Sequence, residues 1–296
     1  MARPRGQETA RLTMRLELIE SLTLPGDATK PNEDAYAFSP VAAAVFDGAT
    51  GLGEQLMPGK SDAQWLAQFG ARRFRAHAEA GEGNIRDFVR GAAADAEKSY
   101  AALRRRPPAQ NYEIAYASAV FATPQDDGLH LMWFGDCAAL LRTPDGTFTF
   151  LGDTMTKRES ERARVERLVK PGGRGPAAAG VRDEFLPALR AARNHVNTGE
   201  DWLFAPDAAC ADHANETRIS TPSAARVLLA SDGFLALASD YARYTPQTLF
   251  AAAETRGLAA LGEELRAIEA ADPEGVRFPR FKRSDDATAL FLVLAA

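Results

Sequence analysis

Residues 41–53 read VAAAVFDGATGLG, in which a short apolar run ends at Asp47-Gly48. An apolar run of this length is typical of a buried strand, and glycine marks the turn that ends it. The sequence therefore predicts that Asp47 lies at the mouth of a buried strand, where its carboxylate is held in a fixed place. A single aspartate at a strand end is commonly an ordinary turn residue exposed to water. The pattern therefore indicates a functional site only where it recurs.

The same pattern does recur along the chain. Acidic residues border apolar runs in Asn32-Glu33-Asp34, Gly135-Asp136, Ser231-Asp232-Gly233 and Ser284-Asp285-Asp286. Carboxylates that converge in space repel one another, and burial raises the cost, so such a cluster persists only where cations neutralise it. All-oxygen ligand sets favour hard ions, Mg²⁺ or Mn²⁺, over zinc or copper.

Two hard ions held close together lower the pKa of a bridging water and neutralise charge on a phosphoryl oxygen. The chain shows no motif for a competing nucleophile, because it lacks a GxSxG elbow and a GxxxxGK[ST] loop. Its histidines, which have neither HxxxH nor HxH spacing, are His77, His130, His195 and His213. A metal-activated water is therefore the chemistry that the sequence supports best.

Composition narrows the class of protein. The 296 residues carry a formal net charge of −5 and are 46% hydrophobic, which is ordinary for a soluble globular chain. The mildly acidic balance argues against a nucleic-acid partner. Cys137 and Cys210 form no CxxC pair, so we expect reduced thiols in a cytoplasm rather than a disulfide framework. We expect no signal peptide and no membrane partner, since no apolar run reaches the length of a span.

The order of elements predicts an α+β fold in one domain, residues 14–296, after a polar leader at residues 1–13. Strands are expected at residues 14–24, 35–38, 41–47, 113–123, 128–136, 138–143, 147–152, 226–230 and 287–294. Helices are expected at residues 62–78, 85–106, 159–170, 183–196, 247–256 and 259–271. Strands and helix pairs come in separate blocks, which favours layers, and the strands of residues 113–152 form an antiparallel meander with Asp-Gly turns. Ser61 and Asn84 are the expected N-caps, with Gln64 completing a capping box.

Five segments together resemble a known family. NEDAYAF, VFDGATG, GDCAALL, LLASDGF and SDDATALFLVL resemble, in this order, the motifs of the metal-dependent (type 2C) protein phosphatases, in their bacterial form. The resemblance runs from about Met14 to Leu294 and implies a four-layer sandwich, with two antiparallel β-sheets packed face to face and flanked by helix pairs. It also implies hydrolysis of phosphoserine and phosphothreonine by a dimetal-activated water.

The resemblance implies a set of metal-site residues: Glu33, Asp34, Asp47, Gly48, Asp136, Asp232 and Asp285. Asp47 matches the aspartate that bridges two metals, and Gly48 the glycine whose carbonyl binds one of them. Glu33 and Asp34 match the pair that holds metal-bound waters, and Asp136 matches a ligand of a third, weaker ion. Asp34, Asp47 and Asp232 are the implied catalytic residues, and two Mn²⁺ or Mg²⁺ ions are the implied cofactors.

Three positions depart from the family's pattern. Thr29 stands where the family often has an arginine that grips the phosphate, and Lys30 beside it is the expected substitute, although a lysine lacks the bidentate fork. Ala49 replaces a histidine proposed as a general acid, so water is expected to protonate the leaving group. Ala138 replaces an arginine, with an expected effect on packing.

The main hypothesis is a cytoplasmic phosphoprotein phosphatase, with a phosphorylated protein as its substrate and a cognate serine/threonine kinase as its partner. Thr29 and Ala49 motivate a first alternative, an inactive pseudophosphatase that serves as a binding module. A phosphatase of small phosphorylated metabolites is the second alternative. Residues 153–200 lie where the family carries a variable flap, so we expect them to influence specificity.

Overall fold

The computed structural model describes residues 14–81, 83–159, 177, 184–280 and 282–296. The predicted leader at residues 1–13 lies outside these residues. So do residues 160–170 of one predicted helix and most of the predicted loop at residues 171–180.

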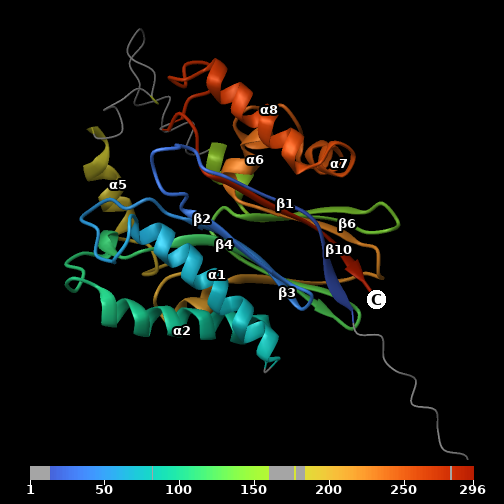
Figure 1. Cartoon of the computed structure of the whole chain (residues 1–296), viewed down its shortest axis with the longest axis horizontal. Helices are drawn as coiled ribbons and strands as arrows, with labels where there is room; N and C mark the ends of the chain where they lie inside the picture. Colours follow the sequence, from blue (N-terminus) through green and yellow to red (C-terminus); the bar gives the residue numbers. More distant parts are fainter. Residues whose placement is uncertain (1–13, 82, 160–176, 178–183, 281) are drawn as a thin grey trace, which may run out of the picture.

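Two antiparallel sheets form the centre of the fold (Figure 1). One has the order β1–β10–β9–β6–β7, with the strands Arg15–Leu24, Ala287–Ala295, Arg226–Ala230, Ala138–Arg142 and Phe148–Leu151. The other has the order β2–β3–β4–β5–β8, with the strands Asp34–Ser39, Ala42–Gly48, Ala117–Gln125, Gly128–Phe134 and Asn215–Ser220. Their facing side chains form one apolar cluster, which includes Val45 and Val120 from one sheet and Leu229 and Leu292 from the other.

Strand β3 shows why the opening stretch of sequence is apolar throughout. Successive side chains of a strand point to opposite faces. Ala44 and Phe46 pack on the helix side of their sheet, whereas Ala43 and Val45 pack against the facing sheet. Both faces of β3 are therefore buried, and the strand ends in Asp47.

Helices cover the outer face of each sheet. The helices α1, Asp62–Ala80, and α2, Ile85–Leu103, lie on the β2–β8 sheet (Figure 1). The helices α6, Asp232–Ser239, α7, Pro246–Arg256, and α8, Leu258–Ala271, lie on the other sheet. The expected four-layer α+β sandwich is confirmed. Further helical elements among the described residues are α5, Leu186–Arg193, η1, Asn111–Glu113, η2, Ala208–His213, and the stretch of residues 154–159.

Both expected N-caps are present. Asn84 forms a full capping box with Asp87. Ser61 Oγ accepts a hydrogen bond from the Gln64 N–H at 3.3 Å, and its hydroxyl donates to Glu33, which ties the start of α1 to the loop before β2. Helix α2 ends at Leu103, before the predicted residue 106.

The predicted meander over residues 113–152 is wrong at its centre. Strands β4 and β5 pair in one sheet, whereas β6 and β7 pair in the other, so the chain crosses between sheets at Gly135-Asp136. Both β5 and β6 are buried on both faces, and a continuous apolar run does not indicate which sheet a strand joins. The crossing places Asp136 at the end of the sandwich where Asp47 lies.

The elements that were not predicted include β8, α6, η1 and η2. Strand β8 is an edge strand with the polar sequence NETRIS, and helix α6 begins directly after β9. Among the described helices, none combines the length and apolar character needed to cross a membrane.

Candidate metal centre

The β2–β3 hairpin brings the first two acidic positions together. Asp34 and Asp47 are direct partners in its antiparallel register, and the Gly48 N–H donates to the Glu33 carbonyl at 3.1 Å. A Cβ at position 48 would lie 2.6 Å from that carbonyl oxygen and 2.8 Å from the carbonyl oxygen of Ala63. Close backbone packing therefore requires a glycine after Asp47.

Asp136 arrives through the crossing between the sheets. The Ser118 hydroxyl donates to its Oδ1 at 2.5 Å, and the Thr154 hydroxyl donates to its carbonyl oxygen at 2.6 Å. Ser118 is also the register partner of Asp47 across β3 and β4. Ser118 thus orients Asp136 from a strand position directly beside Asp47.

Asp232 is the first residue of α6, directly after β9. A Cβ at Gly233 would lie 2.0 Å from the Asp286 carbonyl oxygen, so the Asp-Gly sequence lets the start of this helix pack against the chain before β10. The preceding residue, Ser231, is buried, and its hydroxyl donates to Asp34 Oδ2 at 2.8 Å. The two halves of the site are therefore joined by a buried hydrogen bond.

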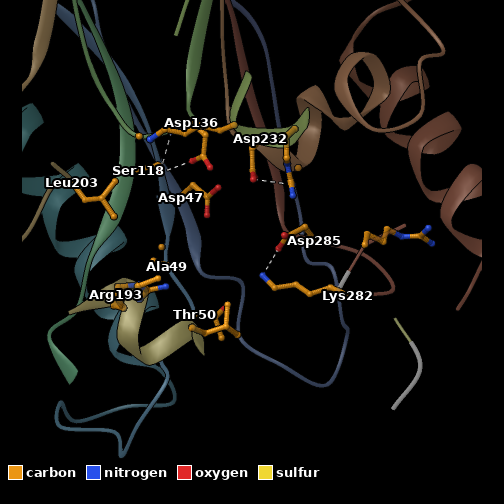
Figure 2. A pocket seen from close by; sticks show the side chains of 18 of the residues that line it. Asp47, Ala49, Thr50, Ser118, Asp136, Arg193, Leu203, Asp232, Lys282 and Asp285 are labelled. Atoms are coloured by element: carbon orange, nitrogen blue, oxygen red, sulfur yellow. Dashed lines mark hydrogen bonds and ion pairs between the residues drawn. The ribbon is translucent and has the colours of Figure 1, made fainter. Parts of the chain in front are cut away.

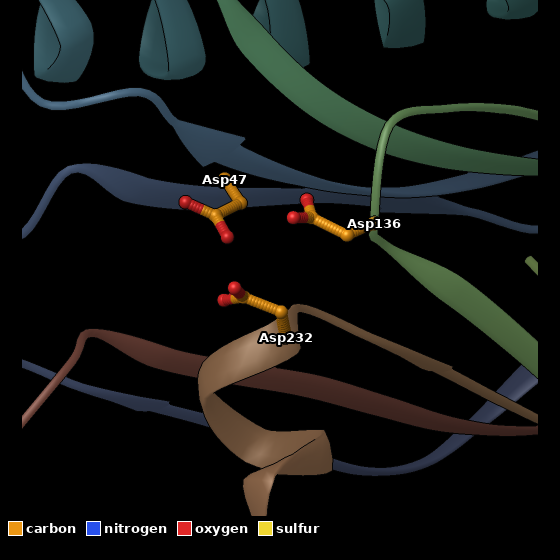
Figure 3. Close-up of side chains that lie close together, drawn as sticks. All are labelled: Asp47, Asp136 and Asp232. Carbon is orange, nitrogen blue, oxygen red and sulfur yellow. The ribbon is translucent and has the colours of Figure 1, made fainter. Parts of the chain in front are cut away.

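Figure 3 shows how Asp47, Asp136 and Asp232 converge from three separate segments. One carboxylate oxygen from each lies within 4.8 Å of the others. All three line a cavity of about 720 Å³, here called the aspartate pocket, and Asp285 lines it too. The sequence predicted this convergence of distant strand ends.

The surroundings of these acids favour a bound cation. Burial, together with neighbouring carboxylates, raises the pKa of Asp34 and of Asp47 well above the ordinary value. Burial raises the pKa of Asp232 to about 7, although Arg158 opposes the rise. Asp34 Oδ1 is buried without a hydrogen-bond partner among the described residues. An all-oxygen set with a buried free acceptor fits a hard divalent ion.

Asp285 stands beside the three clustered aspartates. Its Oδ1 accepts a hydrogen bond from Lys282 Nζ at 2.7 Å. Burial acts to raise its pKa, but Lys282 and Arg158 outweigh burial and hold the pKa below the ordinary value. Asp285 is therefore an ionised carboxylate with a lysine as its present partner.

Asp286 has a structural task that the sequence did not reveal. Its Oδ1 accepts from the Gly26 N–H at 2.7 Å, and its Oδ2 accepts from the Glu33 N–H at 2.6 Å. One carboxylate thereby fastens both ends of the loop between β1 and β2 to the chain before β10.

The structure does not bring Glu33 and Lys30 into the aspartate pocket. Glu33 accepts hydrogen bonds from Thr50, at 2.5 Å, and from Ser61, and it lines a second cavity of about 1030 Å³. Lys30 lines that second cavity as well, with a side chain that is 76% exposed and 3.9 Å from Asp27 Oδ2. Thr29 also bonds Asp27, at 2.7 Å.

Other cations line the aspartate pocket. Figure 2 shows Arg193 of α5 and Lys282 around the same space as Asp47 and Asp232. Arg158 forms an ion pair with one of the three clustered aspartates, 2.8 Å from Asp232 Oδ2. Arg158 and Arg193 were not predicted as site residues because residues 153–200 carry no motif. Ser118 was not predicted because a serine within a strand carries no signal of its own.

Comparisons with known proteins support the fold. No family model matches the sequence, and no curated protein matches it. The catalytic domain of the serine/threonine protein phosphatase PstP, in complex with two manganese ions, is similar in structure, with 15% identity, a TM-score of 0.55 and coverage of 96% of this chain and 100% of that one. PstP/Ppp of Mycobacterium tuberculosis has the same identity and coverage, with a TM-score of 0.56.

A bacterial serine phosphatase is also similar, with 13% identity, a TM-score of 0.53 and coverage of 94% of this chain and 98% of that one. The chain therefore has the fold of the metal-dependent serine/threonine phosphatases, as the resemblance in its motifs implied. Solved structures that are similar to this chain include the bacterial enzymes PstP and the serine phosphatase above.

Proposed function

We propose that this protein is a metal-dependent phosphatase that hydrolyses phosphoserine and phosphothreonine in proteins. The observation that carries the proposal is the convergence of Asp47, Asp136 and Asp232 within 4.8 Å in an open pocket. PstP, which shares the fold, was crystallised with two manganese ions.

The residues placed to hold two Mn²⁺ or Mg²⁺ ions are those of the pocket and of the strand end beside it. Asp47, Asp136 and Asp232 are the central ligands, with Asp285, Asp34 and the Gly48 carbonyl as the additional donors. Glu33 lies further out, and Asp136 would also be available to a third, weaker ion. When bound, such ions lower the pKa of a water and neutralise charge on a phosphoryl oxygen.

The chain's own residues orient the carboxylates and accept protons. Ser118 fixes the rotamer of Asp136, and Ser231 fixes that of Asp34. Asp34 Oδ1, which is buried without a described partner, is the acceptor that we assign to the proton of a water held beside Asp47. Ala49 offers no proton, so water protonates the leaving group.

Phosphate recognition is assigned to cations that line the aspartate pocket. Lys282 and Arg193 line it, whereas Lys30 lines the second cavity. A guanidinium can grip a phosphate with two parallel hydrogen bonds, which makes Arg193 the preferred candidate. Residues 184–203 would then contribute to substrate selection, as expected for a variable flap.

A peptide substrate suits the shape of the site better than a small metabolite. Phe185, Leu189 and Val196 form an apolar wall on the α5 side of the aspartate pocket. Thr50 and Lys282 line both this pocket and the second cavity, so the two spaces are adjacent. An elongated, partly apolar site of this kind accommodates side chains that flank a phosphorylated residue. Such a substrate implies a serine/threonine kinase as a functional partner, and a cytoplasmic location is part of the same proposal.

The test is hydrolysis by the purified protein of a phosphoserine and phosphothreonine peptide panel and of a metabolite panel. We expect release of phosphate from peptides with Mn²⁺ or Mg²⁺, none with EDTA, and none from Asp47→Asn. Turnover confined to metabolites would identify the second alternative. Metal binding without any turnover would identify the pseudophosphatase, the reading favoured by Thr29 bonding Asp27 instead of offering a phosphate grip.

A further inference from the structure

Residues 154–159 are helical and contact two of the three clustered aspartates. At the start of this segment, the buried Thr154 donates to the Asp136 carbonyl oxygen at 2.6 Å. Near its end, the guanidinium of Arg158 lies 2.8 Å from Asp232 Oδ2 and 3.5 Å from Asp240 Oδ2. One short segment is thus fastened to the site at both ends.

The Arg158 ion pair is shielded from water. The side chains of Arg158, Asp232 and Asp240 are 13%, 12% and 12% exposed. Charges interact strongly in such surroundings, and removal of one partner leaves the other charge buried and uncompensated. Arg158 therefore supplies positive charge to an aspartate whose carboxylate lies close to those of Asp47 and Asp136.

A divalent ion at Asp232 would compete with this guanidinium. The same carboxylate would face both cations, and two cations at one carboxylate repel each other. The stronger charge of the ion, shared among Asp47, Asp136 and Asp232, favours its displacement of the arginine. Displacement would release the end of the segment that Arg158 holds, while Thr154 keeps the other end in place.

We propose that Arg158 is a tethered cation that holds Asp232 in the metal-free protein and that the entering divalent ion displaces, so metal binding is coupled to the docking of residues 154–159. The inference rests on the metal site of the proposed function. The docking of residues 154–159 would then depend on whether the site holds a metal ion.

Calorimetric titration with Mn²⁺ in mildly alkaline buffer tests the competition. Arg158→Ala should bind Mn²⁺ about fivefold or more tightly than the wild type, the lower end of usual coupling energies. Its metal-free form should melt at a lower temperature, because the carboxylates lose their internal counter-ion. Arg158→Lys, which keeps the charge, should stay close to the wild type.

Lys157 provides the matched control, because it lies next to Arg158 and lines the same pocket. Lys157→Ala removes the same charge and should change the affinity for Mn²⁺ by about twofold at most, as for an ordinary surface charge. Asp240→Asn weakens the ion pair that helps to hold Arg158, and it leaves the three clustered aspartates unaltered. It should also tighten Mn²⁺ binding, by a smaller factor than Arg158→Ala. This variant keeps the test available should Arg158→Ala fail to fold.

Hydrogen exchange gives a second readout. Mn²⁺ should speed amide exchange in residues 154–159 of the wild type. Unchanged or weaker Mn²⁺ binding by Arg158→Ala and Asp240→Asn, or slower exchange in this segment on loading, would overturn the inference while the metal centre stands. A wild type that binds no Mn²⁺ would overturn the metal centre and the inference together.

Discussion

Asp34 and Asp47 face each other in direct register across the β2–β3 hairpin, and Asp47 lines the aspartate pocket. Like charges directly opposite each other destabilise a strand pair. Here two further carboxylates, those of Asp136 and Asp232, lie close to Asp47. An arrangement that concentrates repulsion in a buried place is typical of a site that binds cations.

The stability of the metal-free protein should fall as the pH rises from about 4 to about 8. Burial raises the folded-state pKa of Asp232 to about 7, against 3.8 as its ordinary value, so folding favours its protonated form. That stabilisation is complete below the ordinary pKa and is lost as the pH rises through about 7. The raised pKa values of Asp34 and Asp47 act in the same direction.

The lowered pKa of Asp285 has the opposite effect on stability. Its contribution is present above about pH 3.8 and is lost only as the pH falls below that value. Thermal melts of EDTA-treated protein across this range check the prediction. Saturating Mn²⁺ should flatten the profile by raising the melting temperature most at high pH. A metal-free melting temperature that increases steadily up to pH 8 would contradict it.

Ser118→Ala should weaken metal binding although Ser118 is not a proposed ligand. Its hydroxyl holds Asp136 Oδ1 at 2.5 Å, and loss of a residue that orients a ligand typically costs about 10–100-fold in affinity. Titration with Mn²⁺ measures the effect. Ser118→Thr keeps the hydroxyl and should recover most of the affinity, whereas equal affinity for all three proteins would show that Ser118 only fills space.

Ser231→Ala should destabilise the protein by about 1–3 kcal/mol, because a buried carboxylate oxygen of Asp34 and the Thr288 N–H both lose their partner. Urea denaturation of the metal-free protein gives the free energy of unfolding. Ser239→Ala on α6, where the hydroxyl bonds Leu235 of its own helix, is the control and should cost less. The reverse order of the two variants would rule out a structural link through Ser231.

Gly233→Ala should damage the site more than any exposed glycine substitution. The added Cβ would lie 2.0 Å from the Asp286 carbonyl oxygen, and relief of such overpacking costs about 1–3 kcal/mol. Gly51→Ala is the matched control, because nothing lies within 4 Å of the added Cβ there. Unfolding curves and Mn²⁺ titrations of the two variants should differ clearly, and similar behaviour would contradict the close packing.

Most of the sandwich was predictable because its strands are either alternating or fully apolar and because helix caps such as Asn84 are visible in the sequence. Sheet membership was not predictable for β5 and β6, which are apolar on both faces and give no orientation. Strand β8 was missed because an exposed edge strand needs little apolar surface, as its residues Asn215–Ser220 show.

The aspartates of the site were predictable since each follows or precedes a strand, and strand ends bring distant residues together. Lys30 illustrates the limit of that logic. Its loop is fastened by Asp286, and its long side chain extends into solvent beside Asp27, a direction that no neighbouring motif specifies. Arg158 shows the converse, because its approach to Asp232 depends on tertiary packing of a segment without a pattern.

Anomalous diffraction from a crystal of the Mn²⁺-soaked protein tests the central claim most directly. We expect two manganese peaks among Asp47, Asp136, Asp232 and their neighbour Asp285, with Arg158 withdrawn from Asp232. No peak at these aspartates in an intact, folded protein would contradict it.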